Sequence, residues 1–375
     1  MSKSLARARH FLERVPFVDG HNDLPYVIRK EKHAQGDLAV YDLTREHQET
    51  DTDIPRLKRG LLGAQFWAAF CPTSAKDPSR FTLELVSLIR EMNVKHADVF
   101  LHATKVSDIR KAKRLGKIAS FIAVESGIGI GDRLEMLDVF HALGVRYMTL
   151  CHNETLDWVD SATDSPRHNG LTAFGRSVIE RMNTLGLLVD MAHTTPEAMH
   201  HVLDVTTAPV AITHANARAL CDHPRNVTDE VLARLKTNGG IVMATFVPTF
   251  INQDIRDWFK PLQTFGKAPE NADMDSLMAT RAKRSGAPPK ATLAQFCDHV
   301  DYLAKTAGID HVGIGSDFYG GPVPVGLEDV SRFPDLIAAL MDRGWSDPAL
   351  EKLASRNFIR VLRGVEKAAV KPGKL

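Results

Sequence analysis

The sequence predicts an α/β fold, a closed (β/α)8 barrel of the TIM type. Short apolar runs alternate with longer segments of helical period along the 375 residues, as in repeated strand–helix units. Near-continuous apolar strands indicate a parallel sheet that is covered on both faces. Polar residues follow most of the apolar runs, at the carboxyl ends of the strands where barrels form their active sites. An open, doubly wound sheet is the competing architecture.

Eight apolar runs are predicted to be strands. They cover residues 17–20, 65–70, 118–124, 147–150, 187–191, 210–213, 241–246 and 312–315. Runs of this length, bounded by polar segments, are typical of buried strands. Since each run is followed by a helical segment or a long connection, eight strand–helix units predict a closed barrel.

Amphipathic segments lie between most of these runs. Helical period is present at residues 82–100, 172–185 and 293–307, and in a short N-terminal helix that ends at Arg14. Pro196 and Thr228 stand where first helical turns are predicted. Two connections, at about 153–170 and 248–290, are longer than ordinary barrel loops, and long loops are often functional. The second has its own helical pattern at 273–284. We expect one domain over residues 1–375 with these two insertions.

The composition excludes several classes of protein. Hydrophobic residues make up 44% and charged residues 25% of the chain, as in ordinary globular proteins. A formal charge of +1 provides no basic surface for nucleic acid or an anionic membrane. Four cysteines are too few for a disulfide scaffold, and we expect all four to be reduced. No signal sequence or membrane-spanning segment is predicted, so the chain as written is expected in the cytoplasm.

Metal-ligating side chains stand at the carboxyl ends of six of the predicted strands. They are His21, Asp23, Glu125, His152, His193, His214 and Asp317. Taken alone, a histidine there is more often a hydrogen-bonded polar residue, and Asp23 or Asp317 could cap a helix or a turn. Glu125 is different, because an ionised carboxylate beside an apolar strand is costly unless it is paired. Together these residues predict a site for zinc or a similar divalent ion.

The number of ligands indicates how many ions bind. Five candidate ligands exceed what one tetrahedral catalytic zinc requires. If Glu125 bridges two ions, the first takes His21, Asp23 and Glu125, and the second takes Glu125, His193 and His214. Two ions about 3.5–4 Å apart would share a water or hydroxide, lower its pKa and polarise a carbonyl oxygen. Asp317 would transfer the proton, and hydrolysis of a C–N bond is the natural use.

These residues lie within motifs that resemble the membrane (renal) dipeptidase family of the amidohydrolase superfamily. The resemblance extends from about Phe17 to Glu366, and the motifs occur in the order of the family. They are residues 18–25, 53–57, 63–67, 124–127, 147–153, 188–193, 214–216, 223–227 and 313–318. The likeness covers nearly the whole chain.

The resemblance implies a zinc enzyme with two ions per subunit that hydrolyses dipeptides, with an L residue first and an L or D residue second. It implies that His152 contacts the substrate carbonyl oxygen and stabilises the oxyanion. It implies that Arg225 binds the terminal carboxylate, a role suited to a planar, bidentate donor. Asp317 would take the proton from the attacking water and deliver it to the leaving amine. By the same analogy, the subunit would form a homodimer.

Three alternatives remain open from the sequence. Another amidohydrolase-type enzyme would act on an N-acyl amino acid, a lactam or a deaminase substrate, but such enzymes usually use one metal or a bridging lysine, whereas Glu125 stands in the bridging place here. A non-enzymatic relative would have lost His21, Asp23 or Asp317, and all three are present. A nucleic-acid hydrolase is disfavoured by the balanced charge.

Overall fold

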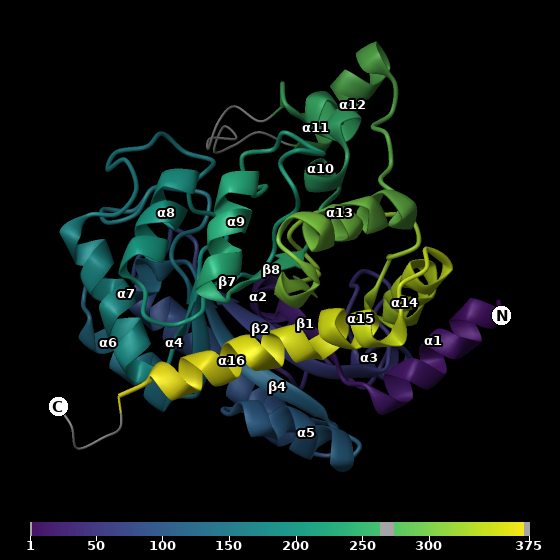
Figure 1. The fold of residues 1–375 in the computed structure, drawn as a ribbon, viewed down its shortest axis with the longest axis horizontal. Helices are drawn as coiled ribbons and strands as arrows, with labels where there is room; N and C mark the ends of the chain where they lie inside the picture. Colours follow the sequence, from purple (N-terminus) through teal and green to yellow (C-terminus); the bar gives the residue numbers. More distant parts are fainter. Residues whose placement is uncertain (1, 263–273, 371–375) are drawn as a thin grey trace.

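The strands form a closed parallel barrel (Figure 1). The computed structural model describes residues 2–262 and 274–370. Its nine-stranded sheet has the order β2-β1-β9-β8-β7-β6-β5-β4-β3, and an additional β2–β4 pairing closes a ring of every strand except β3. The ring is therefore the eight-stranded barrel that the sequence predicts, and the alternative of an open sheet is wrong. The strands are β1 (Phe17–Asn22), β2 (Leu62–Phe70), β3 (Phe100–His102), β4 (Ile118–Glu125), β5 (Val145–Thr149), β6 (Leu188–Asp190), β7 (Ala211–Ile212), β8 (Ile241–Ala244) and β9 (Val312–Ile314).

The strand β3 is the one element of the sheet that the sequence pattern did not predict. The segment 82–100 has helical period, but the helix ends at Lys95 and Phe100 begins a strand of three residues. β3 pairs with β4 from Ile118 to Ser120, and β5 pairs with β4 from Ile122 to Val124. The two strands thus use successive parts of one edge of β4, so β3 extends the sheet at its amino end without entering the ring.

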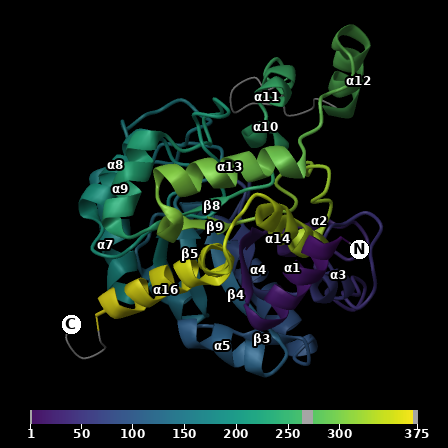
Figure 2. The ribbon, with the colours of Figure 1, turned by 45° about the vertical axis from the view of Figure 1, so that its right-hand side comes forward.

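Helices surround the barrel, and Figures 1 and 2 show α7, α8 and α9 side by side along one flank. Their bounds are α1 (Lys3–Arg14), α2 (Leu24–Lys30), α3 (Ile54–Arg59), α4 (Pro78–Lys95), α5 (Val106–Arg114), α6 (Glu135–Ala142), α7 (Ala173–Leu185), α8 (Pro196–Val205), α9 (Asp229–Asn238), α10 (Pro248–Ile251), α11 (Gln253–Phe259), α12 (Met274–Ser285), α13 (Leu293–Thr306), α14 (Phe333–Asp342), α15 (Asp347–Glu351) and α16 (Asn357–Ala368).

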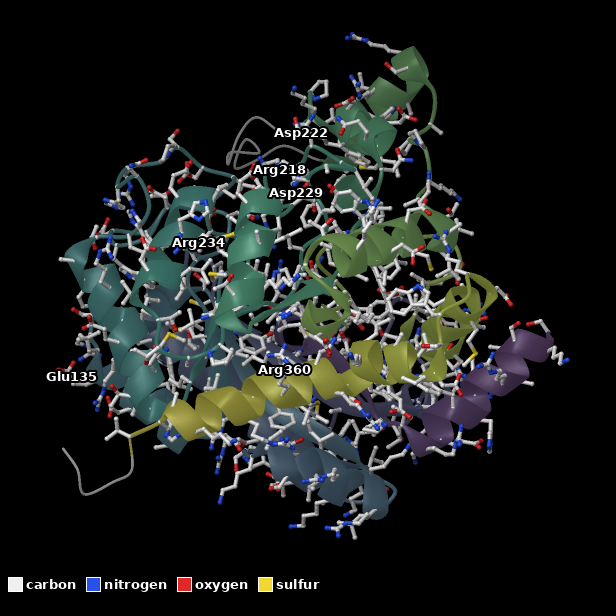
Figure 3. All side chains as sticks on the ribbon, in the orientation of Figure 1. Glu135, Arg218, Asp222, Asp229, Arg234 and Arg360 are labelled. Atoms are coloured by element: carbon white, nitrogen blue, oxygen red, sulfur yellow. The ribbon has the colours of Figure 1, made fainter. Side chains whose placement is uncertain are left out.

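The helices begin where the sequence supplies capping side chains. Thr195 and Thr228 each accept a hydrogen bond from a backbone N–H of the first turn of α8 and α9, as N-cap threonines do. Gly186 ends α7 in the left-handed conformation at φ 77°, which glycine adopts without steric cost. Between helices, Arg234 of α9, labelled in Figure 3, forms an ion pair with Asp204 of α8. Local sequence signals therefore set where these helices begin and end.

Aromatic rings fill the interior of the barrel below the strand ends. Phe66 of β2 stacks on Phe121 of β4 at a centroid distance of 4.4 Å and lies 5.3 Å from Tyr147 of β5. Phe358 of α16, the yellow helix of Figure 1, contacts Phe66 edge to face at 5.1 Å. Arg360 of the same helix donates to the carbonyl groups that precede β8 (Figure 3). The interior of the barrel is thus a packed core, and the polar residues at the carboxyl ends of the strands lie above it.

The two long connections differ in structure. Residues 153–170 form turns and isolated bridges without a helix. The connection after β8 contains α10, α11 and α12, and α12 points away from the barrel in both views (Figures 1 and 2). Of the predicted helix 273–284, position 273 lies outside the described residues. All four cysteines are free and buried. Within the described ranges, no helix is long and apolar enough to span a membrane.

Candidate metal centre

The barrel brings the predicted ligands together at the carboxyl ends of its strands. His21 lies in β1, Glu125 ends β4, and the other residues lie within three positions after β1, β5, β6, β7 and β9. Six of the seven residues are buried, and His152 is half-buried. Three overlapping groups have ligand atoms within 4.8 Å of one another: His21 with Glu125 and His214, Glu125 with His152 and His193, and His21 with Asp23 and Asp317.

Glu125 lies at the centre of this cluster, and its two carboxylate oxygens lie near different histidines. Oε2 lies 3.3 Å from Nε2 of His21. Oε1 lies 3.1 Å from Nε2 of His193 and 3.6 Å from Nε2 of His214. Asp23 lies on the first side, with Oδ2 3.4 Å from Nε2 of His21. The carboxylate therefore stands between two groups of ligand atoms.

Several of these atoms have no hydrogen-bond partner among the described residues. They are Nε2 of His21, Nε2 of His214 and Oδ1 of Asp23, all buried. Buried polar atoms are ordinarily satisfied, because leaving one unpaired costs roughly 1–3 kcal/mol. Asp23 occupies the position before α2, yet its side chain makes no capping hydrogen bond. Imidazole nitrogens and carboxylate oxygens that converge unpaired are the donor set of a divalent metal, so the residues fit such an ion.

The orientation of His21 is set from inside the barrel. Its Nδ1 lies 2.8 Å from the hydroxyl of Tyr147, and that hydroxyl donates to the carbonyl of Gly20 at 2.9 Å. Because a hydroxyl has one proton to donate, it accepts from Nδ1–H of His21. The lone pair of the ring is then on Nε2, which faces Glu125 and Asp23. Tyr147 was not predicted as a site residue, because tyrosine is an ordinary residue of strands and does not by itself indicate a site.

The backbone at the site adopts uncommon conformations. His193 has φ 69° and Asp317 has φ 59°, both in the left-handed region that non-glycine residues seldom adopt. The N–H of Asp317 donates to the carbonyl of His21 at 3.1 Å, which fixes the segment after β9 against β1. Burial raises the pKa of the Asp317 carboxyl well above its usual range. Strain and a shifted pKa of this kind concentrate at functional sites.

His152 and Arg225 lie beside the cluster. The His152 ring lies 4.4 Å from that of His193 and 4.4 Å from that of Phe70, and its carbonyl accepts from Ser161 of the long loop at 2.6 Å. Burial, and then the positive charge of Arg225, lowers the pKa of His152 to about 3, so the imidazole is neutral. The guanidinium of Arg225 is buried, and its Nη1 has no hydrogen-bond partner among the described residues. A buried guanidinium with an unpaired N–H group has the chemistry to bind an anion.

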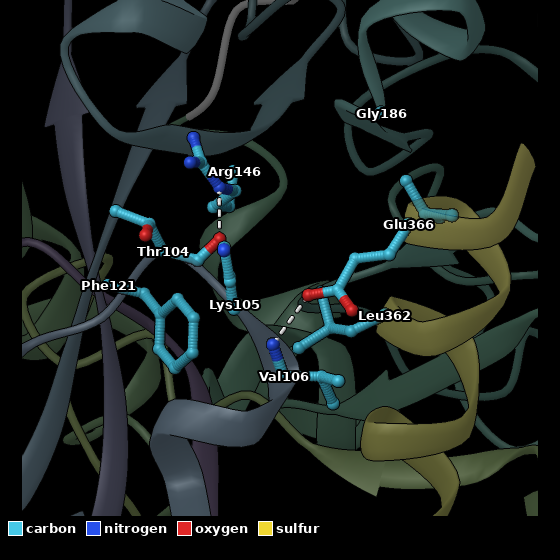
Figure 4. Close-up of a pocket in the computed structure, with 9 residues that line it drawn as sticks. Thr104, Lys105, Val106, Phe121, Arg146, Gly186, Leu362 and Glu366 are labelled. Carbon is cyan, nitrogen blue, oxygen red and sulfur yellow. Dashed lines mark hydrogen bonds between the residues drawn. The ribbon is translucent and has the colours of Figure 1, made fainter. Parts of the chain in front are cut away.

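The cavity in Figure 4 lies elsewhere, at the amino end of the barrel. Its walls include Thr104, Arg146 near the start of β5, and Glu366 of α16. Arg146 donates to the carbonyl of Thr104, and the N–H of Val106 donates to Glu366. With a volume of about 10 Å³, it has room for about one water molecule. Because the amino face of such barrels serves stability, we assign this cavity no catalytic role.

The fold and the side-chain cluster define an α/β barrel with a metal-ligating centre at the carboxyl ends of its strands. The model of the membrane dipeptidase family, peptidase family M19, matches residues 5–373, and the chain belongs to this family. It is accordingly a metallo-dipeptidase.

Relatives of known name agree with this assignment. Dipeptidase tcpJ of Claviceps purpurea is 37% identical over 365 residues, which cover 94% of this chain and 77% of that protein. Dipeptidase ataJ of Aspergillus terreus is 35% identical over 402 aligned residues, with coverage of 98% and 88%. The crystal structure of the probable dipeptidase PvdM from Pseudomonas aeruginosa has a TM-score of 0.84 at 25% identity, over 98% of this chain and 99% of that one.

Proposed function

We propose that this metallo-dipeptidase is a zinc enzyme that holds two ions and hydrolyses free dipeptides of L-Xaa-L-Xaa or L-Xaa-D-Xaa type. The observation that supports it most is the position of Glu125, whose two oxygens face different ligand groups. In this proposal His21, Asp23 and Glu125 hold one ion, and Glu125, His193 and His214 hold the other. The bound ions supply an activated water and positive charge that polarises the scissile carbonyl.

The remaining residues bind the substrate and move protons. The free Nη1 of Arg225 would donate to the terminal carboxylate of the dipeptide, because a guanidinium pairs with a carboxylate bidentately. The neutral imidazole of His152 would donate a hydrogen bond to the carbonyl oxygen as negative charge develops on it. Asp317, 4.0 Å from Nε2 of His21, would accept the proton of the attacking water and return it to the leaving amine.

Release of amino acids from a dipeptide panel tests the proposal. Metal-depleted protein is assayed on L,L and L,D dipeptides before and after addition of zinc, with Asp317→Asn as the control for contaminating peptidases. L-Ala-D-Ala belongs in the panel, since a metallo peptidase from Rhodobacter sphaeroides of the same fold was solved with a phosphinate mimic of it. We expect cleavage that needs zinc and is lost in Asp317→Asn. If zinc-loaded protein cleaves no dipeptide but does cleave N-acyl amino acids or lactams, the substrate assignment is wrong.

A further inference from the structure

A second buried carboxylate, Asp190, lies beneath the candidate metal centre and is not used in the proposed chemistry. It ends β6 and is fully buried. Its Oδ1 accepts the N–H of Ala192 at 3.1 Å and that of Thr213 at 2.9 Å. Its Oδ2 accepts the hydroxyls of Thr149 at 2.6 Å and Thr213 at 2.7 Å. Four donors therefore converge on this carboxylate.

The hydrogen bonds to Asp190 determine which atom donates in the hydrogen bond between Thr213 and His214. The single proton of the Thr213 hydroxyl is directed at Asp190, since a carboxylate accepts and does not donate. The Thr213 oxygen also lies 2.9 Å from Nδ1 of His214. With its proton engaged, the oxygen can only accept there, so Nδ1 carries the imidazole proton. The lone pair is then on Nε2, the atom that lies 3.6 Å from Oε1 of Glu125.

We propose that Asp190 and Thr213 are positioning residues that hold His214 in the tautomer that binds metal through Nε2. This inference rests on the proposed function, because it takes His214 as a ligand. The arrangement is not general to the cluster: Nδ1 of His193 has no hydrogen-bond partner among the described residues. A carboxylate behind a ligating histidine also makes the ring a better donor to the metal.

A purely structural role is the competing explanation, because Asp190 also ties β6 to β5 and to the segment after β7. Thr149 provides the matched control. Its hydroxyl donates to the same Oδ2 as that of Thr213, but within the described part of the chain it forms no hydrogen bond with His214. Thr149→Val and Thr213→Val each remove one hydrogen bond from Asp190, and only the second breaks the link to the imidazole.

Zinc titration of the metal-depleted full chain distinguishes the two explanations. We expect Thr213→Val to weaken binding of one of two zinc ions by roughly 10–100-fold, as loss of an outer hydrogen-bond partner does. Thr213→Ser, which keeps the hydroxyl, and Thr149→Val should stay close to the wild type. Unchanged affinity in Thr213→Val, or an equal loss in Thr149→Val, would overturn the inference.

Asp190→Asn gives a second readout that needs no metal. The backbone donors hold the amide oxygen on the Oδ1 side, so the amide nitrogen donates to Thr213. The Thr213 proton then points at Nδ1 of His214, and the imidazole proton moves to Nε2. In metal-free protein with ¹⁵N-labelled histidine, the His214 nitrogen shifts, assigned by their loss in His214→Asn, should change from the Nδ1–H to the Nε2–H pattern.

Unchanged nitrogen shifts in folded Asp190→Asn would contradict the relay. If Asp190→Asn does not fold, the His214 tautomer is compared between the wild type and Thr213→Val, and an Nε2–H form in the wild type refutes the inference. Failure of the proposed function is distinguishable, since the wild type would then bind no zinc pair while the tautomer measurement still reports on Asp190 and Thr213.

Discussion

Arg225 is the residue that binds the substrate carboxylate in the proposed function. Its guanidinium is buried beside the metal cluster and lies 5.4 Å from the ring of Phe250. Nη2 donates to the carbonyl of His214 at 3.4 Å, whereas Nη1 is unpaired. No carboxylate lies within 4.0 Å of it among the described residues. A buried charge left without a partner is costly, and in the proposed function the substrate carboxylate is the partner that this charge receives.

Replacement of Arg225 should therefore affect recognition of the substrate carboxylate. We expect Arg225→Ala to raise KM for a free dipeptide about 10–100-fold, since a hydrogen bond to a charged group contributes roughly 1.5–3 kcal/mol. Arg225→Lys keeps the charge but loses the planar fork, and should recover part of the affinity. Steady-state kinetics on a dipeptide and its amide provide the check. An equal loss on the amide would show that Arg225 does not bind the carboxylate.

The convergence of the candidate metal ligands could be predicted from the sequence, and their hydrogen-bond partners could not. Histidine, aspartate and glutamate at strand ends stand out because those side chains are rare beside apolar runs. Thr213 and Tyr147 do not, because threonine and tyrosine are ordinary strand residues. The contact of Tyr147 with His21 joins β5 and β1, which are not neighbours in the ring, so it depends on closure of the barrel. The contact of Thr213 with His214 is directed by Asp190 of β6. The role of Arg225 could be predicted only from the family resemblance, since its segment alone is typical of a solvated turn.

At the scale of elements, burial determined which predictions succeeded. The apolar runs correspond to the ring strands because a strand covered on both faces must be apolar along its length. Boundaries were less accurate: the run predicted at 65–70 begins at Leu62 in β2. The strand β3 was missed because it has only three residues and follows a helix of strong period without a break. Its existence depends on pairing with β4, which local sequence does not encode.

The segment before α3 is docked onto the segment after β9 through Asp51. The N–H of Asp51 donates to the Tyr319 hydroxyl at 3.0 Å, and its carbonyl accepts from Val330 at 3.1 Å. Burial raises the pKa of the Asp51 carboxyl to about 6, above the value of about 3.9 in an unfolded chain. The folded state therefore binds this proton more tightly, and the stability linked to it, complete below about pH 4, is lost as the pH rises through 6.

Asp51→Asn should remove that pH dependence. Below pH 4 the free energies of unfolding of the variant and the wild type should change with pH in parallel. Between pH 4 and 7 the wild type should lose stability that the variant keeps. Urea midpoints measured across this range provide the test, with Asp37→Asn as an exposed control. A pH profile of Asp51→Asn parallel to that of the wild type would exclude Asp51 as the source.

At the scale of the whole molecule, the candidate ligands connect segments that are distant in the chain. They extend from His21 to Asp317, and every strand of the ring except β2 and β8 ends in or beside one. Ions bound there would cross-link the carboxyl end of the barrel. At the amino end, α16 and the stacked rings beneath it provide stability that does not depend on metal.

Zinc should therefore raise the thermal stability of the metal-depleted chain. Binding to the folded state alone stabilises it by about 4 kcal/mol per site at a free concentration 1,000 times Kd. We expect a Tm several degrees higher with zinc, measured by circular dichroism, and a much smaller shift with calcium, which prefers oxygen ligands. A Tm that does not respond to zinc would contradict a zinc centre built from these residues.

The closure of the ring has a consequence for biosynthesis. β1 meets β9 through the pairing of Asp19 with Ile314, so the earliest and the last strands of the barrel must come together. Ribosomes release a chain from its N-terminus. His21 and Asp23 thus leave the ribosome long before the strand that completes their surroundings. Metal loading of the finished pocket is then a late event, which follows synthesis of nearly the entire polypeptide.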